Sequence, residues 1–209
     1  LRGHTGKVLI LPNPRANAHG FLRKFGNKWG WEGTENAIVP QLVMWDYIVG
    51  SINPRMLHNK PHLVKRMTEQ FNRDHGFDGF HVPVIGGRWF DFDATSDRVE
   101  STMADPAIPT FEALELLITK THKAGGLVHI WSWGDHSRSQ TPKSLTGGMG
   151  GVIDERLQRY IAARLGPVPG WSMGYGFDLA EWVSASKLKA WRASIHGQMR
   201  VSQFLCGPP

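Results

Sequence analysis

Apolar and polar positions follow two alternating periods from residue 61 to about residue 199, one typical of helices and one of short buried strands. The segments with the helical period are 61–76, 110–126, 152–166 and 184–199. The apolar runs that fit buried strands are 77–87, 127–134 and 170–177. Because strand and helix alternate, the pattern predicts parallel strands joined by right-handed crossovers, which is an α/β fold.

The loops that follow the predicted strands are long, about 86–109 and 134–150, whereas the loops from helix to strand are short. Barrel enzymes carry their chemistry on the loops after the strands, and open sheets do so where the strand order reverses. A sequential barrel and a doubly wound sheet both fit this order of elements. In either fold, residues 85–93, 131–138 and 174–182 are expected to meet at one edge of the sheet.

The same pattern divides the chain into three parts. Residues 1–60 are predicted to be an irregular N-terminal segment with the first strands; 7–11 is the best strand, and 36–50 is a second apolar stretch. Residues 61–199 carry the βα repeat, and 200–209 form an irregular tail. The first residues include no apolar signal region and no initiator methionine, so we expect a mature or excised piece of a protein.

Composition and charge change this picture only in part. No run of about 18 apolar residues occurs, so no membrane span is expected. The single cysteine, Cys206, excludes an internal disulfide and a cysteine-based metal site. The net charge of +6 favours a polyanionic ligand, but the basic residues are scattered, so nucleic acid is not the favoured partner. Nine tryptophans are many for 209 residues, and such rings stack well on flat apolar faces, including those of sugars.

Each predicted strand end carries a similar mixture of aromatic, acidic and basic side chains. The residues in this mixture are Arg88, Trp89 and Asp91 after the first strand, Trp131, Trp133, Asp135, His136 and Arg138 at the second, and Tyr175, Asp178, Glu181 and Trp182 at the third. Cleavage of a glycosidic bond uses two carboxyl groups on either side of a sugar, with aromatic rings holding that sugar. The mixture therefore indicates a carbohydrate site.

Asp178, Glu181 and Asp135 are the predicted catalytic groups, and Asp91 is an alternative to Asp135. Asp178 or Glu181 would protonate the leaving oxygen, and Asp135 or Asp91 would supply the second carboxylate or hold a sugar hydroxyl.

The remaining candidates are predicted to bind the substrate. Trp131 and Trp133 are two residues apart and therefore share one side of their strand. The predicted stacking residues are Trp89, Trp133, Tyr175 and Trp182, and Trp131 is expected to contact the substrate. Arg88 and Arg138 would pair with carboxylate or sulfate groups of an acidic glycan, and His136 would contact the sugar.

Structural roles compete with these functional ones. Asp178 could cap the last helix, although Ser184 is the better cap, and Glu181 could simply lie in that helix's first turn. The Asp135–His136 pair could be a surface turn.

Two further patterns have more than one interpretation. His81 and His129 lie within apolar strands, where a histidine usually belongs to the core; with Asp135 and His136 they could also ligate a metal ion, although no short metal-binding signature is present. The glycine-rich 147–151 could hold a phosphate, but a loop tip is the favoured interpretation. No cofactor is expected.

Three segments, "GFDGFHVPVIGGRWFD", "AGGLVHIWSWGD" and "ERLQRYIAARLGPVPGWSMGYGFDLAEW", resemble successive strand–loop units of the retaining (β/α)8 glycoside hydrolases. The resemblance covers roughly residues 60–200. It implies a (β/α) TIM-type barrel acting on or binding a polysaccharide or oligosaccharide, and a secreted or extracellular protein.

The chain departs from this family pattern in two ways. At the end of the fourth strand, where the family has Asn-Glu with the catalytic acid, this chain has Tyr175–Gly176. The family's nucleophile comes from the seventh strand, whereas about four strands are predicted here. The barrel is therefore expected to be incomplete, its remainder supplied by another chain or by a missing part. Three functions stay open: a glycoside hydrolase, a non-catalytic carbohydrate-binding or structural protein of the same origin, and a metal-dependent hydrolase or lyase.

Overall fold

The predicted parallel sheet is present in the computed structural model, which describes residues 20–33, 37–44, 54–94, 96–199 and 204–206. Its five strands, in spatial and chain order, are β3 (Leu42–Met44), β4 (Gly79–Pro83), β5 (Leu127–Trp133), β6 (Trp171–Gly176) and β7 (Phe204–Cys206). Each neighbouring pair is parallel. An order that never reverses is that of a (β/α) barrel, not of a doubly wound sheet. A complete barrel has eight strands, so the described sheet is part of one.

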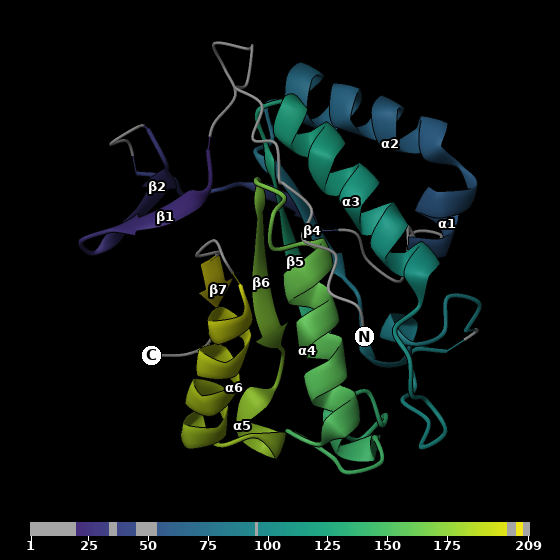
Figure 1. Cartoon of the computed structure of the whole chain (residues 1–209). Coiled ribbons are helices and arrows are strands. Elements are labelled where there is room, and N and C mark those ends of the chain that lie inside the picture. The colour runs from purple at the N-terminus through teal and green to yellow at the C-terminus, as the bar shows by residue number, and fades with distance from the viewer. Residues whose placement is uncertain (1–19, 34–36, 45–53, 95, 200–203, 207–209) are drawn as a thin grey trace, which may run out of the picture.

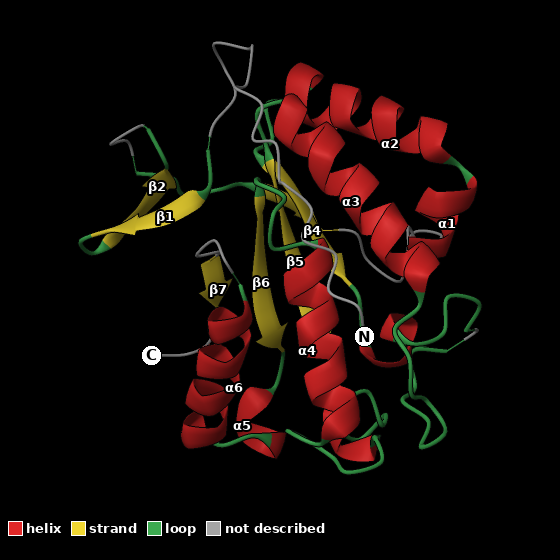
Figure 2. Ribbon diagram, viewed as in Figure 1, coloured by secondary structure: helices red, strands yellow, loops and turns green. Residues whose placement is uncertain are grey.

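Helices cover one face of this sheet, as Figures 1 and 2 show for α3, α4 and α6. The helices are α1 (Pro54–Asn59), α2 (Pro61–Met67), α3 (Ile108–Lys123), α4 (Val152–Arg164), α5 (Leu179–Trp182) and α6 (Ala185–Gln198). A π-helical segment, Thr68–Asp74, continues α2. The three long helices confirm the predicted crossovers, although their ends differ from the predicted ones by a few residues.

Local sequence explains where two of the helices begin. Ser184 caps α6, its hydroxyl accepting a hydrogen bond from the Lys187 amide, as predicted. Thr110 does not cap α3, which begins at Ile108 after Ala107 with a proline in its first turn. The Thr110 hydroxyl instead donates to the Arg88 carbonyl, 2.9 Å away, and so ties α3 to the loop after β4.

The parts outside the regular repeat also contribute strands. The predicted strand 7–11 lies outside the described residues. The apolar stretch 36–50 contains β3, and the tail, for which no element was predicted, contains β7. An antiparallel hairpin, β1 (Leu22–Phe25) with β2 (Lys28–Trp31), precedes the sheet. These strands have only three or four residues each, too few for a clear period.

The main hydrophobic core lies between the sheet and the helices. The helix predicted at 110–126, which is α3, buries one side: Phe111, Leu114, Leu117, Ile118 and Thr121 are all 0% exposed. Alternate strand residues meet this layer, and they are Phe80, Val82, Val128, Ile130, Trp171 and Met173. Burial of this kind contributes about 25 cal/mol per Å² of apolar surface and is the main force that holds the layers together.

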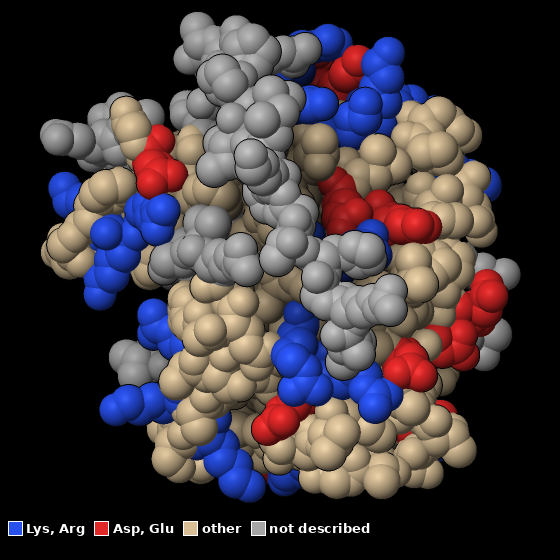
Figure 3. All heavy atoms as spheres, in the orientation of Figure 1, with Lys and Arg blue, Asp and Glu red and all other residues tan. Residues whose placement is uncertain are grey.

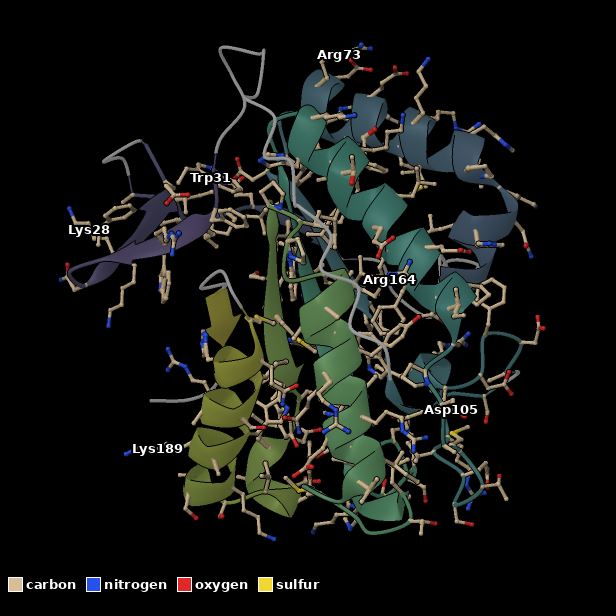
Figure 4. All side chains as sticks on the ribbon, viewed as in Figure 1. Lys28, Trp31, Arg73, Asp105, Arg164 and Lys189 are labelled. Carbon is tan, nitrogen blue, oxygen red and sulfur yellow. The ribbon has the colours of Figure 1, made fainter. Side chains whose placement is uncertain are left out.

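An ion pair links two of the covering helices. The Arg164 guanidinium of α4 donates to both carboxylate oxygens of Glu115 on α3, at 2.6 and 2.9 Å. Figure 4 shows Arg164 between these helices. The planar fork of an arginine matches a carboxylate in this two-bond geometry, so the contact fixes the spacing of α3 and α4.

The opposite face of the sheet, here called the inner face, carries the other alternate residues, among them His81, His129 and Ser172. At the amino ends of the strands, Leu127 packs against Leu22 and Trp31 of the hairpin, with Leu42 beside them. Figure 4 labels Trp31 where the hairpin meets the sheet. The hairpin therefore covers the amino-terminal edge of the inner face, whereas the predicted site lies at the carboxyl-terminal edge.

Charge on the visible surface is dispersed. Figure 3 shows Lys and Arg side chains in several separate groups across the face that it displays. In the described part of the chain, no helix is long and apolar enough to cross a membrane.

Candidate functional site at the carboxyl ends of the strands

All the sequence-predicted site residues follow the carboxyl ends of β4, β5 and β6 or lie within the last residues of β5 and β6. Because the strands are parallel and adjacent, these ends share one edge of the sheet. The predicted meeting of three strand ends is therefore present. Which side chains reach the surface there depends on burial and pairing, residue by residue.

A strip of rings crosses the inner face toward this edge. The centroid of His81 lies 5.1 Å from that of His129 and 4.1 Å from that of Trp131, in an edge-on contact. Trp131 in turn lies 5.6 Å from Phe177, just after β6. Trp131 and Phe177 are partly exposed. The strip therefore ends in two aromatic surfaces that a ligand can reach.

Gly174 provides the space for this arrangement. It pairs with Trp131 across β5 and β6, and a methyl group added at Gly174 would lie 2.8 Å from Cδ1 of the indole and 3.1 Å from Nε2 of His129. The bare backbone of β6 thus forms a floor for the Trp131 ring. Held between Gly174, His81 and Phe177, the indole has few alternative positions, which lowers the entropic cost of stacking a ligand on it.

The two histidines in the strip are neutral near pH 7. Burial lowers the pKa of His81 to about 4. Burial and the charge of His81 lower the pKa of His129 to about 4 as well. Nδ1 of His129 lies 2.7 Å from the Ser172 hydroxyl, and Nε2 of His81 has no partner within the part of the chain that the structure describes. A neutral imidazole has one donor and one acceptor nitrogen, and His129 uses one of its two for Ser172, which fixes the ring beside Trp131.

These pKa values predict an acid-sensitive fold. Between about pH 6.5 and pH 4 an unfolded chain binds protons at both imidazoles whereas the folded protein does not, so stability is complete above about 6.5 and is lost as the pH falls toward 4. The free energy of unfolding of the parent falls as the pH is lowered through this interval. We expect that of His129→Gln to fall by roughly 2 kcal/mol less, because the variant has one titrating imidazole fewer. Urea unfolding across the interval measures the difference, and equal losses in parent and variant would contradict it.

The acidic residues occupy different environments. Asp135 accepts from the amide and hydroxyl of Ser137, both at 2.7 Å, and lies 3.4 Å from Arg138. The hydrogen bonds from Ser137, aided by Arg138, lower the pKa of the Asp135 carboxyl. Asp135 is thus an ionised acceptor and not a proton donor. The Asp135–His136 segment forms the turn that was the structural alternative.

Asp178 and Glu181 are both exposed just beyond β6. Asp178 has φ 50° and ψ 37°, a left-handed conformation that aspartate tolerates better than most residues, and it makes no side-chain cap to α5. Glu181 lies in α5. Asp91 is exposed, and its Oδ1 accepts a hydrogen bond from the Asp93 amide at 2.9 Å. Asp178 is therefore an exposed carboxylate directly after Phe177 of the ring strip.

The predicted stacking role is wrong for four aromatic residues, because the core encloses them. These are Trp89 at 0% exposed, Trp133 at 2%, Tyr175 at 1% and Trp182 at 3%. The Trp89 indole donates to the Ser132 carbonyl at 2.9 Å, and Tyr175 packs 5.4 Å from Trp182 and 4.3 Å from Trp191. Their rings hold the loops and helices to the sheet, so no sugar can stack on them.

The predicted basic residues differ in whether a ligand can reach them. Arg88 is not available to a ligand, because its guanidinium is paired with the buried carboxylate of Asp97. Arg138 has 74% of its side chain exposed, and within the described residues it forms an ion pair with Asp135 at 3.4 Å, so it can still reach a ligand. His136 is exposed, with Nδ1 3.3 Å from the Thr141 hydroxyl.

The strand end where the family pattern has a catalytic glutamate has no room for one. A Cβ at Gly176 would lie 2.5 Å from the Trp133 carbonyl oxygen and 3.2 Å from the Trp133 Cβ. The neighbouring Tyr175 points into the helix-side core. The departure from Asn-Glu at this position is thus part of how β5 and β6 pack. A catalytic acid at the end of β6 would have to come from Asp178 or Glu181.

Sequence reasoning missed Phe177 and the ring contacts of His81 and His129. Strand alternation was the available signal for His81 and His129, because it puts them on the face opposite Phe80, Val82, Val128 and Ile130. Phe177 lies after the end of β6, where alternation gives no signal. Across the described residues, no group of three histidine, cysteine or acidic side chains is placed to hold a metal ion.

Comparison with solved structures supports the fold. The chain is similar to a protein described as "Glycoside hydrolase", with a TM-score of 0.55 and 13% identity over 90% of this chain and 40% of that one. A glycoside hydrolase family 5 protein from Bacteroides vulgatus gives the same TM-score and identity over 90% of this chain and 39% of that one. No family model and no curated protein matches. At this identity the likeness shows a glycoside hydrolase-like fold, and the chain spans about 40% of the length of these neighbours.

Proposed function

We propose that the protein binds a carbohydrate at the carboxyl-terminal edge of the inner face, as part of a glycoside hydrolase-like barrel. The observation that carries this proposal is the pair of partly exposed rings, Trp131 and Phe177, whose centroids lie 5.6 Å apart at the ends of β5 and β6. In (β/α) barrels, ligand chemistry gathers at this edge. Stacking on Trp131 would bury the apolar face of a sugar ring, and Phe177 would extend that surface.

Polar groups around the rings suit a hydroxyl-rich ligand. Asp135 is ionised and accepts hydrogen bonds, and Asp178 is exposed at the end of β6. Aspartate oxygens are good acceptors for pairs of sugar hydroxyls. We assign these two carboxylates to hydroxyl recognition and Arg138, with its exposed guanidinium, to carboxylate or sulfate groups on an acidic glycan. The net charge of +6 supports the same preference.

The arrangement favours binding over retaining hydrolysis. Two-carboxylate hydrolysis needs one carboxyl group with a raised pKa as proton donor and a second one across the sugar. The pKa of Asp135 is lowered, and Gly176 leaves no space for a glutamate at the end of β6. Hydrolysis would therefore depend on Asp178 or Glu181 with strands beyond those described. Those strands would come from another chain or from a further part of the protein, and a polysaccharide ligand would suit an extracellular setting.

A glycan panel tests the proposal. The parent protein is titrated with neutral, uronic and sulfated oligosaccharides by calorimetry, and release of reducing sugar is measured in parallel. We expect saturable binding to at least one glycan, tightest for an acidic one, and no release. Trp131→Ala should weaken binding by roughly tenfold or more, because stacking of this kind contributes on the order of 1–3 kcal/mol.

Phe25→Ala is the matched control, since this phenylalanine is 42% exposed but lies on the hairpin at the other edge. It should bind as the parent does. Absence of binding to every glycan would overturn the proposal, and so would binding that survives Trp131→Ala unchanged. If the parent releases reducing sugar and Asp178→Asn abolishes that release, the function is hydrolysis and not binding alone.

A further inference from the structure

A cavity separate from the ring strip lies in the helix layer, between α4 and α6. Its volume is about 260 Å³. Its lining includes Asp154 and Gln158 of α4, Tyr175 of β6, and Trp191 of α6. The exposed Glu155, Lys187 and Ser194 also line it. Tyr175 faces the helices, so this cavity lies behind β6, on the opposite side of the sheet from Trp131.

Three residues on the lining of this cavity each carry a buried oxygen atom with no hydrogen-bond partner among the described residues. These atoms are Oδ1 of Asp154, Oε1 of Gln158 and the hydroxyl oxygen of Tyr175. The three residues are 2%, 3% and 1% exposed. A buried polar atom without a partner costs on the order of 1–3 kcal/mol, and three in one cavity therefore call for a shared partner.

The hydrogen bonds of Asp154 and Gln158 determine whether their unpartnered oxygens need a donor or an acceptor. Oδ2 of Asp154 accepts from the Gly150 amide at 2.8 Å and from the Gln158 side-chain nitrogen at 3.2 Å. The carboxylate is thus held in place, with its second oxygen free. Since the Gln158 nitrogen is used, its free oxygen is an acceptor, so both free atoms on α4 require a donor. The Tyr175 hydroxyl can also accept from such a donor.

The charge and the aromatic residues of the cavity indicate which class of ligand fits it. Burial raises the pKa of Asp154, and burial with the nearby Asp154 raises the pKa of Tyr175, because each buried negative charge lacks compensation. A cation beside Asp154 would supply that compensation. Trp191, whose ring centroid lies 4.3 Å from that of Tyr175, adds an apolar surface to the lining of the cavity.

We propose that this cavity binds the protonated primary amine of a small organic ligand. A primary ammonium carries three N–H donors, which matches the three free oxygens of Asp154, Gln158 and Tyr175. The bound ammonium pairs with the Asp154 carboxylate, and the ligand's carbon skeleton lies against Trp191. The ammonium can belong to a free alkylamine or to an amino sugar. Lys187 on the cavity lining carries the same group, so it acts as a competing or repelling charge at the entrance.

Calorimetric titration at constant ionic strength near pH 7.5 tests this proposal. The probes are ethanolamine, glucosamine, N-acetylglucosamine and potassium chloride. We expect saturable binding of ethanolamine, glucosamine or both. N-acetylglucosamine, titrated into Trp131→Ala so that the ring strip does not contribute, and potassium ions should not bind, since the first has no ammonium and the second no N–H donors. If only one of the two amines binds, the result shows whether the ligand is an alkylamine or an amino sugar.

Variants locate the binding. Tyr175→Phe removes a single hydroxyl and should weaken amine binding about fivefold, and Asp154→Asn should weaken it about tenfold or more because it removes the charge. Lys187→Met should strengthen it. Tyr160→Phe is the matched control, because the Tyr160 hydroxyl accepts from Arg164 and does not line the cavity.

Three results would overturn the proposal: no saturable amine binding to the parent, potassium binding as tight as amine binding, or amine affinity unchanged in Tyr175→Phe and Asp154→Asn alike. The test is independent of the glycan proposal, because Trp131→Ala should leave amine binding intact.

Discussion

Gly79→Ala is expected to lower the free energy of unfolding by on the order of 4 kcal/mol, which a marginally stable domain cannot readily absorb. Gly79 opens β4 with φ +143°, a conformation that residues with a side chain rarely adopt. A Cβ there would lie 1.8 Å from the Leu127 carbonyl oxygen and 2.8 Å from the Leu127 nitrogen, in the paired strand β5. Because both obstacles are backbone atoms, relief requires the strands to separate at this point.

Urea unfolding followed by circular dichroism measures this loss, and low soluble yield of Gly79→Ala would be the same result in its extreme form. Gly197→Ala is the matched control. Gly197 lies in α6, and a methyl group added there would meet no atom within 4 Å, so alanine should be neutral or add a few tenths of a kcal/mol. A Gly79→Ala protein as stable as the parent would contradict the β4–β5 pairing described above.

The second large effect concerns the ion pair of Arg88 and Asp97. Their side chains are 14% and 8% exposed. Asp97→Ala leaves the guanidinium buried and unpaired, so we expect a loss of about 3 kcal/mol. The double variant Arg88→Met with Asp97→Leu removes both charges and should recover most of that loss. Urea unfolding of the three proteins gives the comparison.

An exposed pair provides the control for this prediction. Arg73 and Asp74 are 3.1 Å apart with 68% and 54% of their side chains exposed, and Asp74→Ala should change stability by less than about 0.5 kcal/mol. If Asp97→Ala instead behaves like Asp74→Ala, Arg88 is not held by Asp97. The sequence prediction that Arg88 serves an acidic ligand would then regain its basis.

The long helices and the central strands could be predicted because their apolar residues repeat over several turns or fill a whole strand. The helix predicted at 110–126 is an example, since its apolar residues Phe111, Leu114, Leu117 and Ile118 recur at helical spacing and are all buried. The short strands β1, β2, β3 and β7 have no such repeat. They are defined only by pairing with a neighbouring strand, and for β3 and β7 the paired residues lie more than thirty positions apart in the chain. The sequential barrel order likewise appears only when the strands are paired.

The sequence predicts where the candidate site lies, but not which side chains are accessible in it. Parallel strands place their carboxyl ends together whatever the side chains are, so the edge followed from the βα order alone. Tyr175 was misassigned because its place in a strand, between Gly174 and Gly176, turns it toward the helices. Arg88 was misassigned because Asp97, its partner, lies across a loop that shows no periodic pattern. Burial and pairing of this kind depend on tertiary contacts.

The most direct test of a carbohydrate site on the inner face follows the tryptophan indole N–H signals by NMR while the best-binding glycan is added. We expect the Trp131 signal, identified by its absence in Trp131→Phe, to move with saturation, whereas the signals of the buried Trp89 and Trp171 stay fixed. A glycan that binds but leaves Trp131 unmoved, or that moves only the buried tryptophans, would contradict this location.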